Sequence, residues 1–222
     1  MLRGIAFGWF VTALATCTFA EEAKVPLQTE MPQEVLAGTP PDVLLLLYPG
    51  LEKPLEKPPQ LLVPPGTTNV AQNKKVTASD ALPILGELKY VTDHVKEGTE
   101  QSYVELGPMK QWVQIDLEKT CEIAAVYVWH YFREARSYHD VIVQVSDDSE
   151  FKQNVHTVFN NDQDNSSQLG IGKDRAYIET NLGKLIDAKG TKGRYVRLYS
   201  GGNTANDLNH YVEVEVFGKP AS

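Results

Sequence analysis

The sequence predicts an all-β protein built as an antiparallel β-sandwich, and three observations support this. Apolar residues alternate with polar ones in several short segments, as Val113, Ile115 and Leu117 do in "WVQIDL". Clusters of Gly, Asn and Asp separate these segments, as expected for turns between strands. No long segment carries the apolar period of an amphipathic helix. Two packed sheets with irregular connecting loops are therefore the expected architecture.

The first twenty residues have the layout of a secretory signal peptide. Arg3 precedes an apolar run from about Ile5 to Ala15, and Thr18 and Ala20 stand at the spacing of a cleavage site. This run is too short to span a membrane. We therefore expect an exported protein that is secreted, periplasmic or on the cell surface, with no transmembrane span in the mature chain. A lipoprotein is the alternative, because residues 14–17, "LATC", loosely resemble a lipobox.

Residues 21–66 are expected to form a Pro-rich linker. Ten of the thirteen prolines lie between Pro26 and Pro65. Proline fixes φ and lacks an amide donor, so the composition favours an extended, semi-rigid spacer. The apolar run "DVLLLLYPG" at 42–50 interrupts it. This run either docks on the following domain or binds a partner, and we favour docking.

Residues 67–219 form the domain proper, which is long enough for one sizeable core. In chain order the clearest strand candidates are residues 112–117, 121–129, 140–148, 194–200 and 211–218. In the last of these, Val214 and Val216 oppose Glu213 and Glu215. The best helical candidate is the short segment 147–155, "DDSEFKQNV".

Charge and cysteine content exclude several classes of protein. The net charge is −8, the sequence pI is about 5.2, and no dense Lys/Arg cluster occurs, so a nucleic-acid partner is not expected. Without the signal peptide the chain keeps one cysteine, Cys121, so no intramolecular disulfide can form. Cys121 begins an apolar strand, which favours a buried thiol over a reactive or intermolecular one.

Several segments, in the same order, resemble the discoidin domain, also called the coagulation factor V/VIII type C domain. They are "NVAQNKKVTAS" (69–79), "YVTDHVKEG" (90–98), "WVQIDLEKTCEIAAVYVWHY" (112–131), "DVIVQVSDDSEF" (140–151), "GRYVRLYSGG" (193–202) and "HYVEVEVFG" (210–218). The resemblance covers essentially the whole domain. It implies a jelly-roll sandwich of the galactose-binding-like fold, which many bacterial carbohydrate-binding modules share. It also implies a ligand site on loops at one end and recognition of glycans or lipid surfaces, without catalysis.

The loop at 130–139 is the first candidate ligand site. Rigid β scaffolds commonly carry their binding groups on such loops. Sugars offer hydroxyls and C–H faces, which planar donors and aromatic rings can match. The candidate residues here are His130, Arg133, Arg136, Tyr138 and His139. Some of these side chains could instead fold inward, and Tyr138 and His139 could simply cap the next strand. The arginines mildly favour an anionic ligand.

A second polar loop, residues 200–211, adds Asn206, Asn209 and His210 to the candidate ligand site. Asn is also an ordinary turn former, so a structural role stays open. "NNDQDNSS" at 160–167 has the same ambiguity, and it lies in a 160–190 segment that is longer than the corresponding loop of the family. An EF-hand does not fit it, because the glycine and terminal glutamate positions are missing.

The resemblance also implies a structural Ca²⁺ near the end of the sandwich. By motif position its side-chain ligands would be Asp93 and Glu213. His94 stands where the family commonly has glycine, which puts the loop geometry in doubt. The alternative is a solvated turn Asp and an outward Glu. A zinc site assembled from His130, His139 and His210 is a further alternative, although no tight zinc motif is present.

Enzymatic signatures are absent from the sequence. There is no Gly-x-Ser-x-Gly, no His-Glu-x-x-His and no phosphate-binding loop. The expectation is a non-catalytic exported module that binds a polysaccharide or glycoconjugate. The alternatives are a protein-interaction or structural module of the cell envelope, with an envelope protein as partner, and an unrecognised hydrolase.

Overall fold

The computed structural model describes residues 23–38 and 40–221, so the expected signal peptide at 1–20 lies outside the described residues. The strands are β1 (Val25–Pro26), β2 (Leu62–Val63), β3 (Thr68–Asn69), β4 (Lys75–Ala78), β5 (Val104–Leu106), β6 (Gln111–Trp129), β7 (Ile142–Ser146), β8 (His156–Asn160), β9 (Lys184–Ser200), β10 (Asn209–Tyr211) and β11 (Glu213–Pro220). The helices are α1 (Pro41–Leu47) and the 3₁₀ helix η1 (Leu88–Thr92). In the described part of the chain, no helix has the length and apolar character needed to cross a membrane.

Two long strands, β6 and β9, build the sandwich by passing through both of its layers. Their antiparallel pairing breaks after Asp116 and resumes at Cys121. Glu118 has positive φ within this break, and Lys189 has positive φ at a second register shift, between Ile123 and Ala125. The first half of β6 joins β4, β9, β7 and β8 in one sheet. The second half joins β11 and β3 in the other. The prediction of an antiparallel β-sandwich is confirmed.

One core lies between the two sheets. Val113 and Ile115 of the first sheet share a buried cluster with Val126 and Val128 of the second. The alternation predicted at 141–145 holds as well, because Val141, Val143 and Val145 all join this cluster. Cys121 is a buried free thiol in the same core, as predicted.

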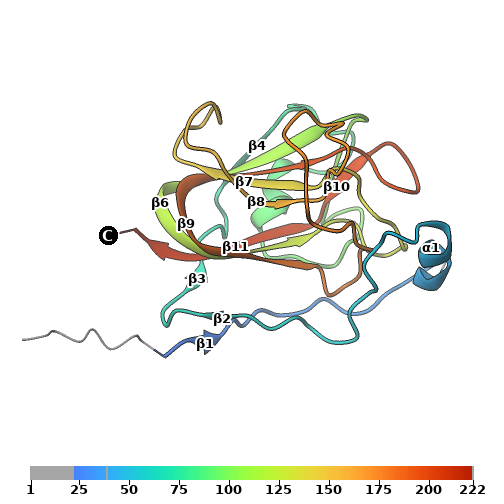
Figure 1. The fold of residues 1–222 in the computed structure, drawn as a ribbon, viewed down its shortest axis with the longest axis horizontal. Coiled ribbons are helices and arrows are strands. Elements are labelled where there is room, and N and C mark those ends of the chain that lie inside the picture. The colour runs from blue at the N-terminus through green and yellow to red at the C-terminus, as the bar shows by residue number, and fades with distance from the viewer. Residues whose placement is uncertain (1–22, 39, 222) are drawn as a thin grey trace, which may run out of the picture.

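The segment at 23–38 and 40–66, here called the strap, packs along the sandwich and corrects the expectation of an extended spacer (Figure 1). Leu27, Met31 and Leu61 pack on a second buried cluster that contains Tyr127 and Trp129. Strands β1 and β2 pair with each other within the strap. The strap covers the outer face of the second sheet because Tyr127 and Trp129 would otherwise be exposed.

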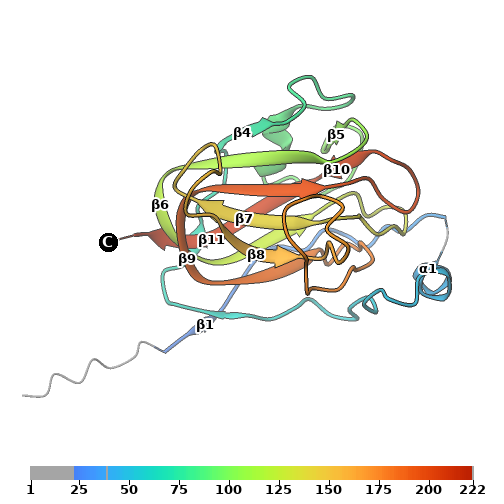
Figure 2. The same cartoon turned by 45° about the horizontal axis from the view of Figure 1, so that its top comes forward.

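The apolar run at 42–50 docks on the domain, as favoured. It forms α1, whose buried residue Leu44 packs with Leu51 and Ile178. Figure 2 shows α1 at one end of the molecule, with β1 and the C-terminus toward the other. The loops after β6 and before β9 lie at the α1 end.

The helix expected at 147–155 is wrong. Asp148 accepts hydrogen bonds from the backbone amides of Glu150, Lys152 and Gln153, and these bonds close turns. Phe151 and Asn154 have positive φ, which interrupts a right-handed helix.

Candidate functional site

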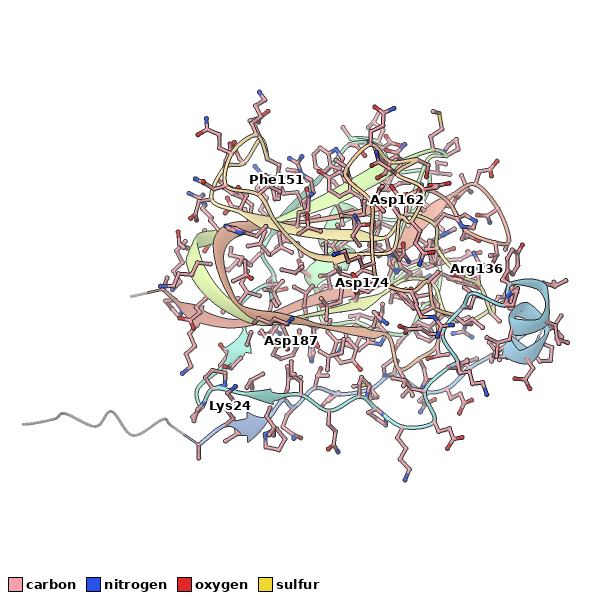
Figure 3. All side chains as sticks on the ribbon, in the orientation of Figure 1. Lys24, Arg136, Phe151, Asp162, Asp174 and Asp187 are labelled. Carbon is pink, nitrogen blue, oxygen red and sulfur yellow. The ribbon has the colours of Figure 1, made fainter. Side chains whose placement is uncertain are left out.

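The polar residues of the predicted site gather at the α1 end of the sandwich, where Figure 3 shows Arg136 beside α1. His130 directly follows β6, and the small β5–β10 sheet brings His210 opposite Glu105. The strand ends therefore bring residues that are far apart in sequence to one place. We call His130, Arg136, Tyr138, Tyr177, Glu179 and His210 the loop-end cluster. It is buried throughout, so the alternative of inward-facing side chains applies to most of the predicted loop site.

His130 and Glu179 form the innermost pair. His130 Nδ1 lies 2.6 Å from Glu179 Oε1, and neither side chain is exposed. The imidazole stacks on Tyr138 at a centroid distance of 4.4 Å. A buried carboxylate beside one ring nitrogen fixes the orientation of the ring and leaves Nε2 to face another group.

His210 connects the cluster to Glu105. Its Nδ1 lies 2.9 Å from the Tyr138 hydroxyl, and its Nε2 lies 3.0 Å from Glu105 Oε2. The pKa of His210 is lowered to about 3 by burial first and then by electrostatic interactions with Arg136 and His130. A neutral imidazole fits both contacts, because Nδ1 can accept from Tyr138 while Nε2–H donates to Glu105.

Four buried polar atoms of the cluster have no hydrogen-bond partner among the described residues. They are His130 Nε2, Arg136 Nε, Tyr177 Oη and Glu179 Oε2. Burial, followed by the nearby charge of Glu179, raises the pKa of Tyr177 well above 10. Buried polar groups are nearly always satisfied in folded proteins, so a concentration of unsatisfied ones is a mark of a functional site.

The remaining predicted ligand residues divide between exposed and structural positions. His139 and Asn206 are exposed, and Arg133 is half-buried. Asn209 is buried and joins three segments, because its amide donates to Gly107 O and Met109 O and its Oδ1 accepts from Gly202 N. Asn209 is therefore a structural residue. The zinc alternative finds no support, since no potential ligand group in the described chain contains His130, His139 and His210 together.

An open groove of about 440 Å³ lies between the strap and the domain, and its Arg133 belongs to the same loop as His130 and Arg136 of the cluster. Arg133, His94 and Glu97 line it from the domain, and Glu30 and Gln33 line it from the strap. Arg133 Nη1 donates to Glu97 O at 3.2 Å and keeps its other donors free for a ligand. This groove is the open part of the predicted site.

The predicted calcium residues lie beside the groove, on the outer face of the second sheet. Glu213 is fully buried, its Oε2 accepts from His94 N at 2.9 Å, and its Oε1 has no partner in the described residues. Burial, with further contributions from the charges of Glu215 and Asp93, raises the pKa of Glu213 to about 9.

The geometry groups Glu213 with His94 and Glu215, whose potential ligand atoms all lie within 4.8 Å of one another. Lys96 Nζ lies 2.8 Å from Glu215 Oε1 and 4.3 Å from the Trp129 ring centre. Lys96 therefore neutralises Glu215 and leaves Glu213 as the uncompensated carboxyl group.

Asp162 and Asp164 of the extended 160–190 segment form a second acidic group with Asp140. Asp162 accepts from the backbone amides of Ser166 and Ser167 and so orders its own loop. Among the described residues this accounts for the Asp/Asn-rich sequence "NNDQDNSS" as turn chemistry.

Sequence reasoning missed Glu105, Tyr177 and Glu179, although Glu105 contacts His210 and Glu179 contacts His130. Glu105 lies outside the segments that were singled out, whereas Tyr177 and Glu179 lie in the 160–190 segment, to which no role was assigned. Only the folded topology brings them to the site. Glu105 carried one signal: it stands between Val104 and Leu106, in a short strand whose neighbours are fully buried.

No family model and no curated protein matches this chain. Solved structures that resemble it include a family 89 glycoside hydrolase from Clostridium perfringens, with 15% identity and a TM-score of 0.49. That match covers 68% of this chain but only 15% of the hydrolase. The CBM32 of AlyQ in complex with 4,5-unsaturated mannuronic acid has 19% identity and a TM-score of 0.45, over 64% of this chain and 93% of that one. A Streptococcus pneumoniae fucose binding module has 20% identity and a TM-score of 0.47, over 67% and 96%. At these identities the similarity concerns the fold and not the ligand.

Proposed function

We propose that this protein is an exported, non-catalytic module that recognises a polysaccharide or glycoconjugate through the α1 end of its sandwich. The observation that carries the proposal is the open groove of about 440 Å³ beside a buried cluster with four unsatisfied polar atoms. Ligand sites typically combine a preformed hollow of several hundred Å³ with a few convergent polar groups.

The groove offers the chemistry that sugar hydroxyls require. Arg133 supplies planar donors, while Glu30 and Glu97 supply acceptors. Met31, Pro32 and Val35 add apolar contacts for C–H faces. Because acidic side chains stand beside Arg133, the groove suits hydroxyl-rich ligands better than densely anionic ones.

A glycan and polysaccharide array with the chain from residue 23 onward tests this proposal. Arg133→Ala should abolish a selective signal, whereas Lys192→Ala should keep it. Lys192 also carries one positive charge, but it lies on β9 beside the bend, paired with Glu122 of β6. A blank array from folded protein, or equal loss in both variants, would contradict carbohydrate recognition in this groove.

A protein-interaction module is the second candidate, and α1 favours it. Leu46 is 83% and Leu47 67% exposed, and Val43 and Tyr48 are also exposed, so the outward side of α1 is apolar. Leu46→Asp should then abolish binding to a purified envelope protein, while leaving retention by polysaccharide unchanged.

We also propose that Ca²⁺ binds at Glu213 with Asp93. Support comes from the buried, unpartnered Glu213 Oε1 and from the proximity of Asp93, whose charge raises the Glu213 pKa. Oxygen donors of this kind suit Ca²⁺, and nearby backbone carbonyls could complete the set. A bound cation would stabilise the sandwich edge and the start of the groove-lining loop at His94.

A further inference from the structure

Hydrogen bonds join the strap to the turns that carry the loop-end cluster at two points. On one side Ala37 N donates to Arg133 O at 2.7 Å. On the other side Glu52 N donates to Ala176 O at 2.8 Å, and the Arg175 guanidinium donates to Gly50 O. Among the anchor residues, Arg133 stands three positions from Arg136 in the chain, while Ala176 and Arg175 stand three and four positions from Glu179.

The two anchored turns are also bonded to each other. Glu179 N donates to Arg136 O at 2.8 Å. The stretch of strap between the anchors carries α1, and its Leu44 and Leu51 pack with Ile178, which lies between Tyr177 and Glu179 in the chain. Residues 40–52, here called the lid, therefore lie against the same turns that carry the unsatisfied atoms.

The lid has two buried apolar side chains, Leu44 and Leu51, and its other anchors are polar, such as the ion pair of Glu52 with Lys184. Leu44 is the buried residue of α1, while Leu46 and Leu47 point to solvent. The helix has two turns, no side-chain cap at its N-terminus and no basic residue in its last turn. A cavity of about 220 Å³ lies between the flanks of the lid, such as Leu36 and Leu55, and Phe132. Segments with few buried apolar contacts are the first to open locally.

The closed state also leaves polar groups without partners. Among the described residues, none bonds His130 Nε2, Arg136 Nε, Tyr177 Oη or Glu179 Oε2 when the lid is down. Opening would let water or sugar hydroxyls reach these groups and so would remove a desolvation cost. A ligand that bonds them binds the open state alone and shifts the equilibrium toward it.

We propose that residues 40–52 form a lid over the loop-end cluster, and that carbohydrate binding extends from the open groove into this cluster when the lid moves. This inference rests on the proposed function, because it concerns regulation of the same site. The ligand class it implies is a polyhydroxyl group that donates to Glu179 Oε2 and accepts from Arg136 Nε.

The test compares Leu44→Asp with Leu46→Asp, which differ in whether the leucine is buried under the lid. Hydrogen exchange is followed in peptides covering residues 133–137 and 175–180, and retention is measured by affinity electrophoresis in gels containing galactan, a neutral polysaccharide. Leu44→Asp should speed exchange in both peptides by about tenfold and strengthen retention by a similar factor, because the binding-competent fraction rises. Leu46→Asp should change neither. If Leu44→Asp does not fold, Leu44→Ala against Leu46→Ala replaces the pair.

The outcomes separate the lid from the function. Equal exchange rates of the two peptides in the two variants would contradict the proposed lid, whatever retention the gels show. Faster exchange without stronger retention, in a protein that the gels do retain, would show that the lid covers no ligand contact and would also overturn the inference. Faster exchange in a protein that no polysaccharide retains would support the opening itself and count against carbohydrate as the ligand.

Discussion

His210 should make the stability of this protein sensitive to mild acid. The side chain is 3% exposed and is held between the Tyr138 hydroxyl and Glu105. Burial, together with electrostatic interactions with Arg136 and His130, lowers its pKa to about 3. In the unfolded chain the pKa returns to about 6.5.

The sign of the effect follows from proton binding. Below pH 6.5 the unfolded chain takes up a proton at His210, while the folded protein does not until about pH 3. The contribution of His210 is therefore complete above pH 6.5 and is lost as the pH falls. Each pH unit is worth about 1.4 kcal/mol, so roughly 2 kcal/mol should be lost between pH 6.5 and pH 5.

The assay is urea unfolding of the wild type and His210→Gln at several pH values between 5 and 8, in chelator. Glutamine can still donate toward Glu105, but it leaves the buried Tyr138 hydroxyl without an acceptor, at a roughly constant cost of about 1–3 kcal/mol. The free-energy gap between the two proteins should therefore shrink by roughly 2 kcal/mol from pH 7.5 to pH 5. The raised pKa of Glu213 gives a slope of opposite sign in both proteins, so the gap and not either curve is diagnostic. Parallel curves would refute the assignment of a neutral, buried His210.

Three further predictions concern the metal, a glycine and the strap. Chelator should lower the wild-type melting temperature, because Ca²⁺ at a hundred times its Kd adds about 2.7 kcal/mol to the free energy of unfolding. Glu213→Gln should be insensitive to chelator, and identical wild-type melting curves with and without chelator would count against Ca²⁺. Gly183→Ala should cost more than about 2 kcal/mol in urea unfolding. Its φ is +58° and a Cβ would lie 2.7 Å from Trp129 Nε1, whereas Gly50→Ala meets nothing within 4 Å and should be near neutral; equal costs would contradict the crowding. A chain beginning at residue 67 should lose roughly 5 kcal/mol or more and bind a hydrophobic dye, because Tyr127 and Trp129 lose their cover, and an unchanged melting temperature would show that the strap is dispensable.

The sandwich was predictable because its strongest signals are local. Alternation placed Val113, Ile115 and Leu117 on the core side, and all three are buried. The bend in β6 was not visible in the same way, since Glu118 and Lys189 adopt positive φ for a reason set by the crossing between sheets. The turn at 147–155 was mistaken for a helix because Asp148 caps a turn and a helix start with the same hydrogen bonds.

The candidate site was only half predictable, because the sequence does not show how deeply each side chain is buried. His130 and His210 were singled out for their chemistry, and the fold does bring them to the same end. Their partners Glu179 and Glu105 come from segments with no distinctive pattern, so the burial of the cluster could not be foreseen. Arg133 and Arg136 are three residues apart, yet one lines an open groove and the other is 4% exposed.

The sequence feature that could have predicted the docking of the strap lies in the domain and not in the strap itself. In "CEIAAVYVW", Val126 and Val128 face the core, while Ala125, Tyr127 and Trp129 give the opposite face an apolar character too. A strand that is apolar on both faces must be covered on both faces. The Pro-rich segment supplies that cover with Leu27, Met31 and Leu61. Because its prolines already restrict φ, the segment loses less conformational entropy on docking than a flexible linker would. The same composition that suggested a free spacer thus favours a fixed outer layer.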